Sequence, residues 1–189
     1  MSRSVFLHVC CAPCATAVLE KLREDDMDVH GLFYNPSIHP WKEFRRRMNA
    51  LEEWAPTCGL PVEYIREYPL EENIGMLLSA ESRCYSCFSD RLCKTASEAS
   101  RLGFDCFTTT LTVSPYQNQD FIRKAALEAA LINGVEYLHY DFRDRYRRSV
   151  ELSRGFGMYR QAYCGCVFSE RDRYLKRADA EKRHPQNGY

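Results

Sequence analysis

Short apolar runs alternate along the chain with longer segments in which apolar residues recur every three or four positions. The runs are bounded by polar or turn-forming residues and predict buried strands; they span residues 4–9, 29–34, 62–65, 104–111 and 135–140. The recurring spacing predicts amphipathic helices, which span residues 14–25, 40–55, 71–79, 84–101, 118–132 and 143–155. Pro13 suits the first turn of the first helix.

Regular alternation of strands and helices predicts an α/β fold, with an open parallel sheet and helices on both faces, as in Rossmann-like proteins. The chain shows no internal repeat and no linker long enough to separate two domains. We therefore expect a single α/β domain over residues 1–180, with its site at the carboxyl edge of the sheet. The polar residues 181–189 are expected to form a disordered tail.

The composition is that of a globular protein, with 189 residues, 45% apolar and 28% charged. The formal net charge is zero, which neither favours nor excludes a nucleic-acid partner. No apolar run is long enough for a transmembrane helix, and the N-terminus lacks the pattern of a secretory signal. We therefore expect a cytoplasmic protein with no membrane partner.

Ten cysteines are the most unusual feature of the composition. Most of them are clustered, in groups at Cys10, Cys11 and Cys14, at Cys84, Cys87 and Cys93, and at Cys164 and Cys166. Clustered thiols in a reducing compartment more often bind metal or carry out redox chemistry than form structural disulfides. The isolated Cys58 and Cys106, together with Cys93, are assigned to packing.

The first group directly follows the first predicted strand. Cys10, Cys11 and Cys14 therefore lie at the edge where ligands of open α/β sheets bind. They also lie at the N-terminus of a helix, where the helix dipole favours a thiolate, the form of cysteine that ligates metal.

Two close pairs accompany this group. Cys84 and Cys87 form a C-x-x-C pair at the start of a helix, with both sulfurs on one face. Cys164 and Cys166 flank a glycine, and this pair could ligate metal or open and close as a disulfide. Four sulfurs from two pairs match the ligand set of an iron–sulfur cluster, for which zinc is the main competitor.

Polar residues in two predicted loops at the same edge are further candidates. The stretch FYNPSIHP contains His39, and the stretch FTTTLTVSPYQN contains Tyr116. Both stretches also fit ordinary turn chemistry. His8, on the first predicted strand, is more typical of a core histidine with satisfied hydrogen bonds than of a ligand.

Residues 142–163 carry six arginines interleaved with aromatic residues, a composition suited to contacts with an RNA backbone and stacking on its bases. The alternative is a solvated helix face. A second basic segment occupies residues 42–47. The candidate RNA-binding residues in the two segments are Arg45, Arg46, Arg147, Arg148 and Arg160.

Taken together, the stretches HVCCAPC, FYNPSIHP, RCYSC with DRL, FTTTLTVSPYQN and YRQAYCGC resemble the QueH-type epoxyqueuosine reductases, over residues 8–168. The resemblance implies a nucleotide alpha-hydrolase-like (HUP-type) fold. It also implies an oxidoreductase that reduces the epoxide of epoxyqueuosine at the wobble position of tRNA, the last step of queuosine biosynthesis. Such enzymes are unrelated to the cobalamin-dependent enzyme for the same reaction.

The resemblance further implies a [4Fe-4S] cluster with an additional iron or other divalent metal nearby. By motif, Cys10, Cys11, Cys84 and Cys87 would ligate the cluster, and Cys14 is the candidate ligand of the second metal. Cys164 and Cys166 would form a redox-active pair. An exchange of roles, with Cys164 and Cys166 on the cluster and another pair in redox use, fits the spacing equally well.

The implied reaction needs two electrons, two protons and an external electron donor. Its candidate proton donors are His8, His39 and Tyr116. Two other functions remain open: a cluster-free thiol–disulfide oxidoreductase and a zinc-containing RNA-binding module. An ATP-using hydrolase of the same broad fold is disfavoured, because the loop after the first predicted strand, CCAPC, lacks the glycines of a phosphate loop.

Overall fold

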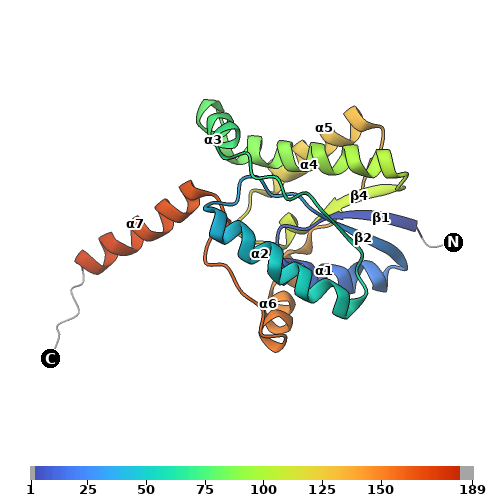
Figure 1. Ribbon diagram of the computed structural model, residues 1–189, viewed down its shortest axis with the longest axis horizontal. Coiled ribbons are helices and arrows are strands. Elements are labelled where there is room, and N and C mark those ends of the chain that lie inside the picture. Colours follow the sequence, from blue (N-terminus) through green and yellow to red (C-terminus); the bar gives the residue numbers. More distant parts are fainter. Residues whose placement is uncertain (1–2, 184–189) are drawn as a thin grey trace.

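The computed structural model describes residues 3–183 and contains one five-stranded sheet (Figure 1). All neighbouring strands are parallel, and their spatial order is β3-β2-β1-β4-β5. This order is that of the first five strands of the doubly wound arrangement, and it places β1 at the centre of the sheet. The strands are β1 (Arg3–His8), β2 (Met27–Phe33), β3 (Val62–Tyr64), β4 (Cys106–Thr109) and β5 (Glu136–Tyr137).

Helices connect the strands and cover both faces of the sheet, which confirms the predicted fold class (Figure 1). The α-helices are α1 (Ala12–Glu24), α2 (Trp41–Trp54), α3 (Leu70–Ser79), α4 (Arg83–Leu102), α5 (Gln119–Asn133), α6 (Tyr146–Gly155) and α7 (Val167–Arg183). Three short 3₁₀ helices are η1 (Ala55–Cys58), η2 (Thr110–Val113) and η3 (Phe142–Arg145).

The central strand β1 is buried on both faces, so it separates two apolar layers. Val5 and Leu7 belong to a core formed with α1 and α2, whereas Phe6 belongs to a core formed with α4 and α5. Alternate residues of a strand point to opposite faces, and here both faces are covered by helices. This explains why the strand reads as a continuous apolar run in the sequence.

Two predicted strands are shorter in the structure. The strand expected over residues 104–111 ends at Thr109, where the Thr109 hydroxyl accepts a hydrogen bond from the Leu111 backbone N–H and η2 begins. The strand expected over residues 135–140 contains only two paired residues, because it lies at the sheet edge and pairs only with β4. In both segments the apolar run correctly predicted buried side chains, such as Phe107 and Tyr137, but overestimated how many residues pair with a neighbouring strand.

Helix α7 was not predicted from the sequence. It projects from the body of the protein (Figure 1). A helix that packs against no neighbouring layer needs no apolar face, so its sequence lacks the amphipathic spacing from which the other helices were predicted. The helix includes residues 181–183, which were expected to be disordered. The remainder of the predicted tail, residues 184–189, lies outside the described residues. Among the helices described, none has the length and apolar content to cross a membrane.

The edge formed by the carboxyl ends of the strands is where the predicted site residues converge. Because each crossover helix runs back along the sheet, the N-termini of α1 and α4 lie at the same edge as the ends of β1 and β4. The first group of cysteines follows β1, and Cys84 and Cys87 lie at the start of α4. Topology thus accounts for the approach of segments that are about seventy residues apart in sequence.

Candidate metal and redox site

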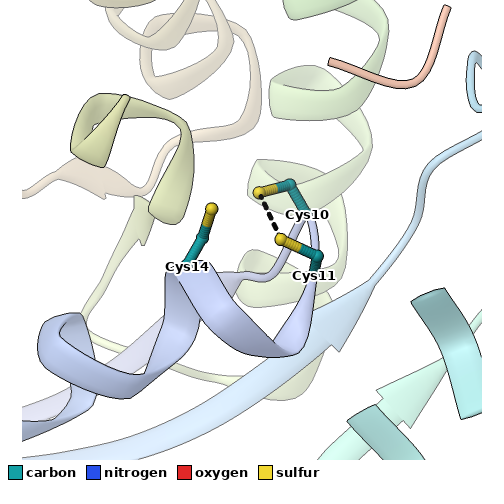
Figure 2. Close-up of side chains that lie close together, drawn as sticks. All are labelled: Cys10, Cys11 and Cys14. Atoms are coloured by element: carbon teal, nitrogen blue, oxygen red, sulfur yellow. Dashed lines mark hydrogen bonds between the residues drawn. The ribbon is translucent and has the colours of Figure 1, made fainter. Parts of the chain in front are cut away.

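Cys10, Cys11 and Cys14, which we call the thiol triad, form the centre of the site (Figure 2). Cys11 is the N-cap of α1 in an extended conformation, and Cys14 follows in the first helical turn. All three sulfurs lie within 4.8 Å of one another, and the Sγ atoms of Cys10 and Cys11 are 3.8 Å apart. The strand end and helix start therefore gather three soft donors at the dipole-positive end of α1.

Mutual hydrogen bonding shifts the pKa values of the three cysteines in opposite directions. Donation by Cys11 and then by Cys14 holds the pKa of Cys10 well below its usual range. The same interaction with Cys10 raises the pKa of Cys11 to about 12 and that of Cys14 well above its usual range. Without a cation, the close approach of the three sulfurs favours ionisation of Cys10 and opposes ionisation of the other two cysteines. A bound metal ion would favour the thiolate form of all its cysteine ligands.

Two polar side chains from distant elements complete the surroundings of the triad. The Thr110 hydroxyl, at the end of β4, lies 3.3 Å from Cys10 Sγ and 3.0 Å from the Cys10 backbone nitrogen. The Gln161 amide donates to Cys11 Sγ at 2.9 Å. Hydrogen bonds to ligand sulfurs are a recognised means of tuning metal–thiolate centres.

Helix α4 contributes the second cysteine pair and a buried cation. Its N-cap Ser82 accepts from the backbone N–H of Tyr85, which fixes the turn that carries Cys84 and Cys87. Cys87 is buried, and its Sγ accepts a hydrogen bond from Arg91 Nη2 at 3.0 Å. Although burial opposes its charge, Cys87 and Cys10 raise the pKa of Arg91.

Cys164 and Cys166 lie in the connection between α6 and α7. Cys164 is exposed and within electrostatic range of both Cys84 and Arg91. Hydrogen bonding by Cys166 lowers the pKa of Cys164 to about 5, whereas the same interaction raises that of Cys166. An exposed thiolate next to a protonated thiol is the arrangement expected of a dithiol that forms and reopens a disulfide.

The structure brings the cysteine groups to one edge but does not merge them into a single ligand set. Among the described residues, only the thiol triad forms a group of three or more potential metal-binding donor atoms within 4.8 Å of one another. Cys84 and Cys87 lie outside that group, and Cys14 lies inside it. Cys106 is buried in β4, and Cys58, the last residue of η1, is half-buried, as is typical of packing residues.

The three candidate proton donors occupy different environments. His8 is fully buried, its two ring nitrogens lie 2.9 Å from Thr109 Oγ1 and 3.1 Å from Tyr34 O, and burial lowers its pKa to about 4. His39 is also buried, with a pKa lowered by burial and no hydrogen-bond partner for Nε2 among the described residues. Tyr116 is 85% exposed.

Tyr116 and Cys84 line the same surface cavity of about 430 Å³. Arg83, Phe88, Phe121 and Asn118 also line it. The cavity therefore combines an exposed aromatic ring, a cation and a sulfur at the carboxyl edge of the sheet.

Several of the candidate RNA-binding arginines are occupied by contacts within the protein. Arg148 pairs with Glu20 at 2.9 Å, and the Arg46 guanidinium lies 5.3 Å from the centre of the Tyr159 ring. Arg45 lies 5.8 Å from the centre of the Trp41 ring. Arg147 and Arg160 are exposed and form no ion pair with any described residue.

Two residues near the thiols, Arg91 and Gln161, were not singled out from the sequence. A third, Arg47, was included in the basic segment 42–47 as a possible RNA contact, and its burial contradicts that interpretation. Arg47 and Arg91 are 1% and 7% exposed. Both fall on the apolar stripe of an amphipathic helix, and a cation at a position expected to be buried was the available signal. No local pattern distinguished Gln161.

Fold and site together define a Rossmann-like parallel α/β protein with a thiol-rich centre at the carboxyl edge of its sheet. The sequence matches the family model described as "Epoxyqueuosine reductase QueH" over residues 5–172. The chain belongs to the QueH family.

Curated relatives support this assignment over most of their length. The QueH epoxyqueuosine reductase of Thermotoga maritima is 35% identical over 95% of this chain and 97% of its own length. That of Dehalococcoides mccartyi is 32% identical, over 93% of this chain and 97% of its own length. That of Streptococcus pyogenes serotype M1 is 37% identical, over 88% of this chain and 70% of its own length.

Solved structures share the fold at low sequence identity. One is described as a predicted subunit of a tRNA methyltransferase from Methanocaldococcus jannaschii (TM-score 0.52, 13% identity, 80% of this chain and 74% of that chain). Another is the U34-tRNA thiolase NcsA from Methanococcus maripaludis with its [4Fe-4S] cluster (TM-score 0.52, 12% identity, 97% of this chain and 68% of that chain). At these identities the likeness establishes the fold alone.

Proposed function

We propose that this protein is an epoxyqueuosine reductase that converts epoxyqueuosine at the wobble position of tRNA to queuosine. Membership of the QueH family supports the activity, since the relatives named above carry that name. The observation in the structure that carries the proposal is the thiol triad, with Arg91 within electrostatic range of Cys10, Cys87 and Cys164.

The donor set of the site fits a metal–sulfur group. Iron–sulfur clusters are held by cysteine thiolates, and the triad offers three sulfurs within 4.8 Å of one another. Cys10, Cys11, Cys84 and Cys87 would hold a [4Fe-4S] cluster, and Cys14 would serve a second iron or other divalent ion. When bound, these groups supply single electrons and a Lewis acid for the epoxide oxygen.

The remaining cysteine pair suits the electron balance of the reaction. Conversion of an epoxide to an alkene consumes two electrons and two protons and releases one water. Oxidation of the Cys164–Cys166 dithiol to a disulfide releases two electrons and two protons, so one oxidation balances one turnover. An external reductant then regenerates the dithiol. The chain's own thiols thus account for the stoichiometry, and we propose that no cobalamin takes part.

The cavity lined by Cys84 and Tyr116 supports entry of a nucleotide at this edge. A wobble base splayed out of an anticodon loop could stack on the exposed Tyr116 ring, as single-stranded bases commonly do on aromatic side chains. Tyr116 and His39 are the proposed proton donors. His8 is less suited, because both of its ring nitrogens are already bonded and its pKa lies near 4. We place the reaction in the cytoplasm, with tRNA as the macromolecular partner.

The decisive experiment combines anaerobic purification with replacement of the α4 pair. The Cys84→Ala/Cys87→Ala variant should lose bound iron and acid-labile sulfide, the EPR signal of the reduced protein and epoxyqueuosine reduction. Cys58→Ala, a half-buried thiol away from the site, is the matched control and should keep all of these. Full activity in the double variant would contradict the cluster assignment, and wild-type protein that holds zinc without sulfide would contradict it independently.

The two other functions predict different outcomes in the same experiment. A thiol–disulfide oxidoreductase would be active without iron, and a zinc-containing RNA-binding module would have no redox activity. Neither is favoured by the family to which the chain belongs.

A further inference from the structure

The connection between α6 and α7 crosses the carboxyl edge of the sheet and passes the N-terminal end of α2 (Figure 1). We call residues 159–166 of this connection the strap. The strap carries Cys164 and Cys166, and its Gln161 reaches Cys11 Sγ. It has no regular secondary structure, so its position depends on specific contacts.

A single buried side chain on α2 binds the strap backbone. Arg47 is 1% exposed, and its Nη1 and Nη2 donate to the carbonyl oxygens of Cys164 (2.8 Å) and Tyr163 (3.1 Å). Its Nε donates to Glu43 Oε1 at 2.7 Å. The planar fork of arginine directs these donors in fixed directions, which a lysine ammonium could not reproduce. Arg47 therefore fixes both the position and the orientation of the strap next to Cys164.

Further contacts surround this one. The Tyr159 hydroxyl donates to the second carboxylate oxygen of Glu43, so both members of the buried ion pair contact the strap. The Tyr163 hydroxyl donates to the His39 carbonyl at 2.7 Å, and the His39 backbone N–H donates to the Gly165 carbonyl at 2.8 Å. The contacts converge on the region around Cys164.

Gly165 allows this close approach. Its φ is +124°, a conformation that residues with a side chain rarely adopt. A Cβ at this position would lie 2.9 Å from Ile38 Cγ1 and 3.0 Å from Arg47 Nη1. The glycine between the two cysteines is therefore required by the packing of the strap against Arg47.

The strap is not part of a continuous apolar core. A cavity of about 370 Å³ lies beside the beginning of the strap, lined among others by Tyr159, Met158, Arg46 and Trp54. Arg160, Ala162 and Cys164 are exposed. A segment held by a few hydrogen bonds rather than by apolar burial opens locally at much lower free energy than the core.

We propose that Arg47, supported by Glu43, is a positioning residue that docks the strap and so sets the placement of Cys164 and Cys166 beside the thiol triad. The proposal rests on the proposed function only for the redox role of the two cysteines. The docking itself is a property of the folded chain and can be measured without activity.

Limited trypsin digestion of the purified full-length protein tests the docking, because the exposed Arg160 lies within the strap. Arg47→Lys keeps the charge but loses the fork, and should increase the rate of cleavage after Arg160 by about tenfold or more. Gly165→Ala should have the same effect without altering α2. Arg101→Lys, on the exposed side of α4, is the control and should cleave at the wild-type rate.

Labelling of the buried Cys106 thiol in the same samples reports global unfolding. Faster cleavage after Arg160 with unchanged Cys106 labelling supports the proposal. Wild-type cleavage in both variants would overturn it, as would Cys106 labelling that accelerates in step with cleavage in both. If Arg47→Lys does not fold, Gly165→Ala decides alone. The redox role and the docking can fail separately. If Cys164 proves to have no redox role but the variants still show faster cleavage after Arg160, the redox part of the proposed function is wrong and the docking by Arg47 stands.

Discussion

Two buried guanidinium groups flank the thiols, one on each face of the sheet. Arg47 comes from α2 and is balanced by Glu43, whereas Arg91 comes from α4 and has no carboxylate within ion-pair distance among the described residues. A buried cation without an anionic partner is strongly destabilising. Arg91 instead donates to Cys87 Sγ and lies within electrostatic range of Cys10, so it is placed to offset negative charge on metal-bound sulfurs.

Arg91→Met should weaken metal retention, because it removes the charge that offsets the thiolates and the hydrogen bond to Cys87 Sγ. We expect bound iron per chain to fall several-fold, measured by iron and sulfide analysis after anaerobic purification. Arg101→Met on the same helix should retain wild-type iron, and circular dichroism should confirm that both variants fold. Wild-type iron content in Arg91→Met would contradict the charge-balance argument.

Cys164 should react with alkylating reagents at an unusually low pH. Its pKa is lowered to about 5, so the thiolate is present above that pH and is lost as the pH falls through it. Burial raises the pKa of Cys58, which should react only in alkaline solution. At about pH 6, labelling of Cys164 should exceed that of Cys58 at least tenfold, as measured by peptide mass spectrometry. Equal rates at that pH would show that Cys166 does not stabilise the Cys164 thiolate.

At the scale of the element, the first turn of α4 connects helix stability to the site. Ser82 caps this turn, and Cys84 and Cys87 lie within it and just after it. A helix terminus without its cap frays first, and fraying would displace the cysteines before the core is affected. The cap therefore has a role in cysteine placement as well as in stability.

Ser82→Ala should reduce the free energy of unfolding by about 1 kcal/mol, because the Tyr85 backbone N–H loses its acceptor. Chemical denaturation monitored by circular dichroism measures this change. Ser100→Ala, at an exposed position in the last turn of α4, should change stability by less than about 0.5 kcal/mol. An equal effect of the two substitutions would indicate that the Ser82 cap is not formed.

At the scale of the whole molecule, the formal net charge is zero, but the arginines of residues 142–163 differ in whether they pair with an acidic group. Arg143, Arg145 and Arg148 are paired with acidic groups of the same chain. Arg147 and Arg160 have no such partner among the described residues and remain available to an external anion. The proposed interaction with tRNA should therefore depend on fewer arginines than the sequence suggests.

The Arg147→Ala/Arg160→Ala variant should weaken tRNA binding several-fold and reduce the slope of log affinity against log salt by roughly two. Arg148→Ala should have a smaller effect, since Glu20 already neutralises this residue. Filter binding or fluorescence anisotropy at several salt concentrations measures both effects. A larger loss of tRNA affinity in Arg148→Ala than in the double variant would contradict the prediction that the unpaired arginines make the contacts.

The sequence by itself determined the elements and their class. Apolar runs and amphipathic spacing located all five strands and α1 to α6 to within a few residues, because burial against a sheet imposes period and polarity on the residues themselves. The sequence also placed cysteine groups after β1 and at the start of α4. Both positions lie at one edge of the sheet, because parallel topology brings strand ends and helix starts together there. The same motifs indicated the QueH family.

Tertiary structure alone decided which groups meet. The Arg47 contact with the Cys164 carbonyl and the Gln161 contact with Cys11 depend on side chains from elements that are distant in sequence. The strap has no periodicity to predict it, and α7 has little tertiary contact to impose a pattern. Periodicity records burial against a neighbouring layer, whereas the meeting of particular side chains depends on how the layers and loops are assembled in space.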